Sequence, residues 1–310
     1  MGKTKFKGVL MLLITALVWG ASFVAQSIGM ESVEAFTYNG IRTLLGAAVL
    51  LPFVLIRDKL SIKNGKKTKA EISEENKKVL KIGSLLGVVF CCATNLQQFA
   101  FNFTGAGKIA FITATYMFLV PIIGLFLFRK RVPLLTWISV LIGTVGTYFL
   151  CIDPTYPGSF NMGDILSFGC AVFFALHILL IEKLGSDLDG VKLSCMQFLV
   201  GGAISVICMF IFETPDVSSI MSATLPILYS GVMSCGVAYT FQIVGQKYTE
   251  ATVASLLMCM ESVFAVICSA ILLSERMLPR EILGCAIMFG AIIISQISDS
   301  PLLKNLKTKK

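Results

Sequence analysis

Ten long apolar segments occupy most of the chain, and their length is the strongest constraint on its fold. A bilayer core about 30 Å thick needs roughly 20 apolar residues in a helix. Segments of that length occur at residues 8–29, 37–56, 79–101, 108–128, 133–152, 163–181, 192–212, 223–244, 251–273 and 279–298. They do not alternate with period two, so they predict an all-α membrane protein rather than a barrel. The composition agrees, because only 14% of the residues are charged, about half the fraction of a soluble domain.

The formal net charge of +8 is distributed unevenly along these segments. If the N-terminus is cytoplasmic, 22 of the 26 Lys and Arg fall on the cytoplasmic side. The positive-inside rule therefore predicts that both termini are cytoplasmic in a multi-pass protein of the plasma or inner membrane. Because orientation accounts for the basic excess, no nucleic-acid partner is predicted. The Lys-rich segment 57–78 is expected to be a cytoplasmic loop, either a solvated linker or a short frayed helix.

The two halves of the chain show weak internal similarity at offsets of 145 and 155 residues. The pairs include Gln97 with Gln242, Tyr116 with Glu261, and Trp19 with Phe174. We expect a first five-helix repeat at residues 1–152, and a second at 153–310 that ends in a basic cytoplasmic tail. Since five is an odd number of spans, the two repeats must be inverted relative to each other, as in many secondary carriers.

Several stretches carry a family pattern. The first segment contains LVWGASFV, the sixth begins GDILSFGCAVFFALHILL, and the third continues into the fourth as FAFNFTGAGKIAFITATYMFLVP. A matching stretch, GQKYTEATVASLLMCMESVFAVICSAILLSERMLPREILG, joins the eighth segment to the ninth and tenth. Over residues 8–298 the sequence resembles the drug/metabolite transporter superfamily, and within it the EamA-type ten-helix carriers. This resemblance implies export or exchange of small metabolites, including amino acids, through a central cavity.

Two departures from the family pattern concern helix shape. Ser262 stands where the family often has a proline, which argues against a kink in the ninth segment. Pro121 comes later than usual in the fourth segment, so any bend there would be displaced.

Ionisable residues inside the apolar segments are few, and each is a candidate for function. A charge at the bilayer centre costs about 2.5 to 3.5 kcal/mol on insertion scales, so it normally faces a cavity or a partner. Glu261, near the middle of its segment, is a candidate proton site or a partner for a cationic group, unless it is a hydrogen-bonded structural carboxyl. Arg42 either snorkels outward or faces inward, where it would bind a substrate carboxylate or pair with Glu261. His177, the only histidine, is a second candidate for proton coupling, with a packing role as the alternative.

Uncharged polar and aromatic side chains complete the predicted site. The substrate cavity is predicted to be lined by Trp19, Arg42, Gln97, Tyr116, His177, Tyr239, Gln242 and Glu261. Phe174 is expected to contribute a further aromatic wall. The alternative for the aromatic residues is core packing, and for the amides it is hydrogen bonding between helices.

Motifs for other functions are missing from the sequence. It has no zinc-ligand spacing, no phosphate-binding loop and no recognisable nucleophile elbow. We therefore predict no metal, no cofactor and no enzyme activity. The predicted function is secondary transport of a small metabolite across the bilayer by alternating access. A passive channel or facilitator is the first alternative, a non-transporting membrane sensor is the second, and the oligomeric state is left open, with a monomer as one option.

Overall fold

A computed structural model describes residues 3–129, 132–152, 160–272 and 277–298 of the chain. It contains ten spans that are long and apolar enough to cross a membrane, which confirms the predicted number. In chain order they are α1 (Lys3–Met30), α2 (Ala35–Lys63), α3 (Lys69–Ala100), α4 with α5 (Ala106–Ala114 and Tyr116–Phe128), α6 (Leu134–Cys151), α7 (Met162–Leu184), α8 (Gly190–Phe212), α10 with η1 and α11 (Thr224–Tyr229, Ser230–Tyr239 and Thr240–Gln246), α12 with α13 (Ala251–Met258 and Met260–Leu272) and α14 (Pro279–Ser298). A short helix, α9 (Val217–Ser222), connects α8 to α10.

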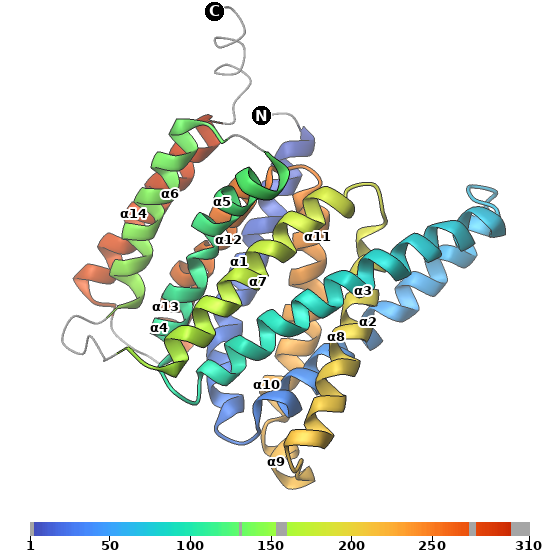
Figure 1. Cartoon of the computed structure of the whole chain (residues 1–310), viewed down its shortest axis with the longest axis horizontal. Helices are drawn as coiled ribbons and strands as arrows, with labels where there is room; N and C mark the ends of the chain where they lie inside the picture. Colours follow the sequence, from blue (N-terminus) through green and yellow to red (C-terminus); the bar gives the residue numbers. More distant parts are fainter. Residues whose placement is uncertain (1–2, 130–131, 153–159, 273–276, 299–310) are drawn as a thin grey trace, which may run out of the picture.

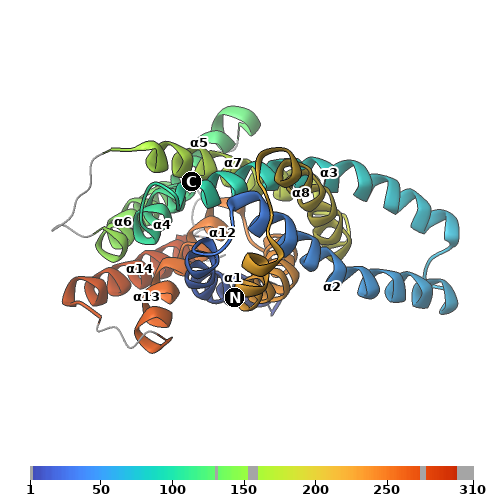
Figure 2. The same cartoon turned by 90° about the horizontal axis from the view of Figure 1, so that it is seen from below.

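The spans form one bundle with a central group and two edges. Helix α1 lies in the centre and contacts η1, α11, α12 and α13. Helices α6 and α14 pack together along one edge, and α2, α3 and α8 form the opposite edge (Figure 1 and Figure 2). Helix α1 begins and α14 ends at the same end of the bundle, which we call the N-terminal end (Figure 1).

The outer surface of the bundle is apolar. Phe126, Phe210 and Phe212 are each at least 70% exposed, which is unusual for a protein surface in water. Small residues occupy the close helix crossings inside, as is common where membrane helices pack. For example, a Cβ atom at Gly146 would lie 2.8 Å from Cγ of Met288, where α6 meets α14. This distribution is what a lipid solvent requires.

Helices α2 and α3 extend further than the sequence predicted. The segment expected to be a loop at 57–78 is mostly helical, because α2 continues to Lys63 and α3 begins at Lys69. At 1.5 Å per residue the two helices are about 44 and 48 Å long, longer than a bilayer core of about 30 Å. The Nζ atom of Lys192 on α8 lies 2.7 Å from Oδ1 of Asp58 and 3.0 Å from Oε2 of Glu75, which ties the hairpin to the bundle.

Two spans are interrupted near their middles. The fourth span breaks at Thr115, between α4 and α5, and the ninth breaks at Cys259, between α12 and α13. The ninth span is therefore interrupted although Ser262 stands where the family often has a proline, so the break does not depend on a proline. Under the 145-residue offset the two breaks fall within one residue of each other.

The eighth span contains a π-helix, η1, which was not predicted. Such segments are wider than an α-helix and are frequently found at functional sites. A Cβ atom at Gly231 would lie 2.9 Å from the carbonyl oxygen of Arg42, so glycine there lets η1 approach the backbone of α2.

Helices α2 and α8 are joined at both ends by carboxylates. At the N-terminal end, Asp58 at the end of α2 pairs with Lys192 at the start of α8. At the opposite end, Glu213 at the end of α8 accepts hydrogen bonds from the backbone N–H and the hydroxyl of Thr37 at the start of α2, each at 2.7 Å. Under the 155-residue offset Thr37 corresponds to Lys192, and Asp58 corresponds to Glu213. The pair Asp58–Lys192 at one end therefore occupies the same repeat positions as the pair Glu213–Thr37 at the other end.

Candidate functional site

A small cavity lies in the middle of the bundle, and we call it the central cavity. It has a volume of about 30 Å³, room for a water molecule or two. Its walls come from α1, α2, α3, α4, α5, α7, η1, α11 and α13. It is lined by Trp19, Ser22, Phe23, Gln26, Arg42, Gln97, Thr113, Tyr116, Phe174, Ile178, Ser234, Tyr239, Gln242 and Glu261. Seven of the eight residues predicted for the cavity, and Phe174, are therefore brought together.

Arg42 reaches this cavity from α2 and is only 2% exposed. Its Nε donates a hydrogen bond to Oδ1 of Asn39 at 2.7 Å, and its guanidinium carbon lies 5.3 Å from the centre of the Tyr38 ring. Asn39, also on α2, is held against α3, because its Nδ2 donates hydrogen bonds to the Thr94 carbonyl at 2.9 Å and to Oδ1 of Asn95 at 3.0 Å. Among the residues that the structure describes, no carboxylate lies within ion-pair distance of Arg42.

Glu261 enters from α13, on the first turn after the break in the ninth span. It is buried, and its Oε1 accepts a hydrogen bond from the Tyr116 hydroxyl at 3.4 Å. Helix α13 lies directly against α1, since a Cβ atom at Gly20 of α1 would be 2.8 Å from the Glu261 carbonyl oxygen. The ion pair between Arg42 and Glu261 is not formed in this structure, so the two side chains are held at the cavity by separate partners.

Aromatic rings form the apolar part of the wall. The ring centres of Trp19 and Tyr239 are 4.5 Å apart, and those of Tyr116 and Phe174 are 6.5 Å apart. Tyr239 is also packed edge-on against Phe90 at 4.9 Å. These contacts give the cavity wall an aromatic portion beside its amides and charged groups.

His177 is not brought to the central cavity. It is fully buried on α7, where its Nε2 lies 2.9 Å from Oε1 of Gln197 on α8, and its ring packs near Phe90. This placement corresponds to the packing alternative rather than to a cavity role. Within the described ranges, no group of three or more His, Cys, Asp and Glu side chains is arranged to hold a metal ion.

Six lining residues were missed by the sequence interpretation, and five of them are Ser22, Phe23, Gln26, Thr113 and Ile178. The spacing of three of them in the sequence could have predicted their position. Together with Trp19, the residues Ser22, Phe23 and Gln26 have the spacing i, i+3, i+4, i+7 of a single helix face. Ser234 was missed as well, and its position depends on η1, which the sequence does not signal.

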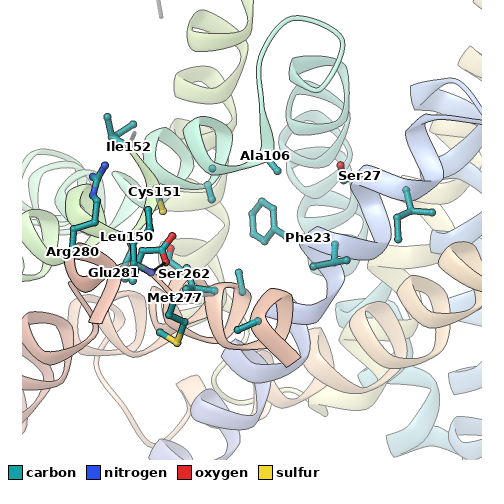
Figure 3. A pocket seen from close by; sticks show the side chains of 18 of the residues that line it. Phe23, Ser27, Ala106, Leu150, Cys151, Ile152, Ser262, Met277, Arg280 and Glu281 are labelled. Atoms are coloured by element: carbon teal, nitrogen blue, oxygen red, sulfur yellow. Dashed lines mark hydrogen bonds between the residues drawn. The ribbon is translucent and has the colours of Figure 1, made fainter. Parts of the chain in front are cut away.

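A larger cavity of about 610 Å³ opens at the end of the bundle opposite the N-terminal end, and we call it the end cavity. It is enclosed by the last turns of α1 and α6, the first turns of α4 and α14, and α13. Figure 3 shows Phe23 and Leu150 among its labelled apolar residues, with Arg280 and Glu281 on α14. Phe23 lines both cavities and therefore lies between them.

Direct contacts join helices at the N-terminal end of the bundle. Near the end of α7, Oε1 of Glu182 accepts the backbone N–H of Ala251, the first residue of α12, at 2.8 Å. Nearby, Nε2 of Gln246 donates to the Ile178 carbonyl at 3.2 Å. A carboxylate at a helix N-terminus satisfies unpaired backbone donors and is favoured by the helix dipole.

Ten membrane spans around a small buried cavity define a multi-pass membrane protein. The model of the EamA-like transporter family matches residues 6–152 and 161–296. The chain belongs to this family and is therefore a membrane transporter, which confirms the resemblance seen in the sequence. The family is one of transporters rather than enzymes.

Similar proteins match over most of their length. The chain is 29% identical over 287 residues to an uncharacterized transporter of Archaeoglobus fulgidus, a match that covers 91% of this chain and 83% of that protein. It is 21% identical over 302 residues to the uncharacterized transporter YoaV of Bacillus subtilis, covering 95% and 98%. A solved crystal structure of a protein with 18% identity has the same fold, with a TM-score of 0.75 over 94% of this chain and 96% of that one.

Proposed function

We propose that the protein is a secondary carrier of a small amphipathic metabolite, such as an amino acid, and that it exports or exchanges its substrate by alternating access. The observation that carries the proposal is the central cavity, where a buried arginine, a carboxyl, several amides and aromatic rings converge. Polar groups this deep in a membrane protein normally mark a transport pathway. We place the protein in the plasma or inner membrane.

The proposed architecture is two inverted five-helix repeats, at 1–152 and 153–310. Four pairs of residues related by the 145- or 155-residue offset all line the central cavity. They are Trp19 with Phe174, Phe23 with Ile178, Gln97 with Gln242, and Tyr116 with Glu261. The exchanged contacts between α2 and α8 support the same relation. A binding site between inverted repeats is the usual arrangement in carriers of this kind.

Alternating access is supported by a difference between the two ends. Glu182 caps α12 at the N-terminal end. The same offsets relate Glu182 to Ser27 and Ala251 to Ala106, and both of these line the end cavity (Figure 3). No hydrogen bond joins Ser27 to Ala106 among the described residues. We propose that the protein is closed at one end and open at the other here, and that the second conformation reverses this.

The function is tested by counterflow in liposomes that contain the purified protein. Liposomes loaded with a high concentration of an unlabelled solute are diluted into the same solute at trace concentration, radiolabelled, across a panel of amino acids, organic acids and amines. We expect transient accumulation of label for at least one solute, with an initial rate that saturates. Uptake that never saturates, or single-channel conductance in a planar bilayer, would identify the protein as a channel.

The proposed orientation is tested by thiol labelling in whole cells. Cysteines are introduced at Lys66, in the turn between α2 and α3, and at Phe160, which precedes α7 and is 78% exposed. An impermeant maleimide should label Phe160→Cys in intact cells, and Lys66→Cys only after the cells are opened. A chain whose ten native cysteines are replaced serves as the background. Labelling of both positions from the same side would contradict the ten-span arrangement.

A further inference from the structure

We propose that Arg42 is the binding site for a carboxylate of the transported solute. This inference rests on the proposed function, because it requires that the central cavity receive the substrate. If it is correct, Arg42 is the residue that makes the protein bind acids more tightly than their neutral analogues.

The argument begins with the charge of Arg42. A guanidinium stays protonated in proteins, and removing it from water is costly unless an anion compensates it. Arg42 is 2% exposed, and its partners are a neutral amide and an aromatic ring. No carboxylate compensates it among the described residues. A bound anion would therefore supply what the folded chain does not.

The geometry of the side chain leaves its binding atoms available. Of the five guanidinium donors, the Nε–H is the one hydrogen-bonded to another described residue, and it is held by Asn39. The two terminal nitrogens retain four N–H groups, in the planar fork that matches a carboxylate bidentately. Since Asn39 is itself anchored on α3 through Thr94 and Asn95, the guanidinium is held in one orientation before any ligand arrives.

The remaining polar atoms of the cavity describe the rest of the ligand. The Oε1 atoms of Gln26 and Gln242 are buried without a hydrogen-bond donor. Buried acceptors of this kind are normally satisfied, so the ligand is expected to carry N–H or O–H groups as well as its carboxylate. The rings of Trp19 and Tyr239 offer contact for an apolar portion. A 2-amino or 2-hydroxy acid has this combination of groups.

The volumes agree with a site that closes around its ligand. The central cavity of about 30 Å³ is smaller than a typical ligand pocket of about 300–1,000 Å³, whereas the end cavity of about 610 Å³ falls within that range. The solute would enter from the end cavity past Phe23, and the central cavity must widen to receive it.

The test measures binding separately from transport. Thermal unfolding of the full-length purified protein is followed with increasing concentrations of the twenty protein amino acids and lactate, each compared with its own primary carboxamide. Ligands that bind the folded state raise the unfolding midpoint. We expect at least one acid to stabilise the wild type, and its carboxamide to need a roughly tenfold higher concentration for the same shift. In Arg42→Gln the acid should lose this advantage, with both ligands acting within about twofold of each other.

Two further variants keep the result interpretable. Arg57→Gln removes a guanidinium from the exposed end of the same helix, where it pairs with Asp189, and should leave the preference for the acid unchanged. If Arg42→Gln does not fold, Arg42→Lys retains the charge but not the fork and should show a reduced preference. The inference is wrong if carboxamides stabilise the wild type as well as acids do, if no acid stabilises it, or if folded Arg42 variants keep the wild-type preference. Failure of counterflow with a preserved acid preference would instead contradict only the proposed transport.

Discussion

The double variant Ser27→Cys and Ala106→Cys is expected to form a disulfide that reduces transport at least roughly tenfold, because the disulfide holds the end cavity closed. At the N-terminal end, the corresponding residues Glu182 and Ala251 are in direct contact through a hydrogen bond of 2.8 Å. If the opposite end closes in the same way, Ser27 and Ala106 will approach each other equally. A disulfide needs Cα atoms about 4.4–6.8 Å apart, so it forms only when that approach occurs.

The measurement is counterflow in liposomes before and after mild oxidation, and again after reduction. Transport should fall on oxidation and recover fully with a reductant. The background must lack Cys151, because its side chain also lines the end cavity (Figure 3). Each single cysteine is the control and should be insensitive to oxidation. A cross-linked protein that exchanges solute at the uncross-linked rate would show that this end does not close during transport.

We propose that Glu261 carries a coupled proton, so replacing it with glutamine is expected to abolish proton-driven accumulation while leaving exchange of solute largely intact. Among the described carboxyls, Glu261 is the one in the central cavity, and its hydrogen-bond partner is the neutral Tyr116 hydroxyl. A glutamine has nearly the same shape but cannot carry a proton. The variant should therefore lose accumulation driven by an imposed pH gradient, by roughly tenfold or more, while counterflow without a gradient persists.

Two matched variants accompany this experiment. Glu261→Asp keeps the carboxyl and should retain part of the gradient-driven accumulation. Glu74→Gln removes an exposed carboxylate that pairs with Lys77 on the surface of α3, and it should behave as the wild type does. If Glu261→Gln accumulates solute along a pH gradient as well as the wild type, this carboxyl does not carry the proton.

The fold was predictable because each membrane span has to satisfy its own backbone inside lipid. Twenty apolar residues therefore indicate a helix, whatever its neighbours are. The extended α2–α3 hairpin was mistaken for a loop because its lysines lower the hydropathy. The start of α3 was nevertheless encoded, since Thr68 and Glu71 form a reciprocal capping box at its N-terminus.

The site was partly predictable for a different reason. Charged and amide side chains are rare within the apolar segments, so Arg42, Gln97 and Glu261 stood out, and the structure places them on one cavity. His177 stood out by the same criterion, but its helix turns it toward Gln197. Which way a helix is rotated depends on packing against its neighbours, and a single sequence does not contain that information.

The turn at the tip of the α2–α3 hairpin has a practical consequence for imaging the molecule. Gly65 adopts a left-handed backbone with φ of 66°, and no residue other than its two chain neighbours comes within 4 Å of the position that a Cβ would take. The tip lies at the end of two continuous helices, and α2, the shorter of them, is about 14 Å longer than a bilayer core is thick. A folded protein grafted there would be carried on a stiff stalk, clear of detergent, and would give this small particle the asymmetric landmark that electron cryomicroscopy needs for alignment.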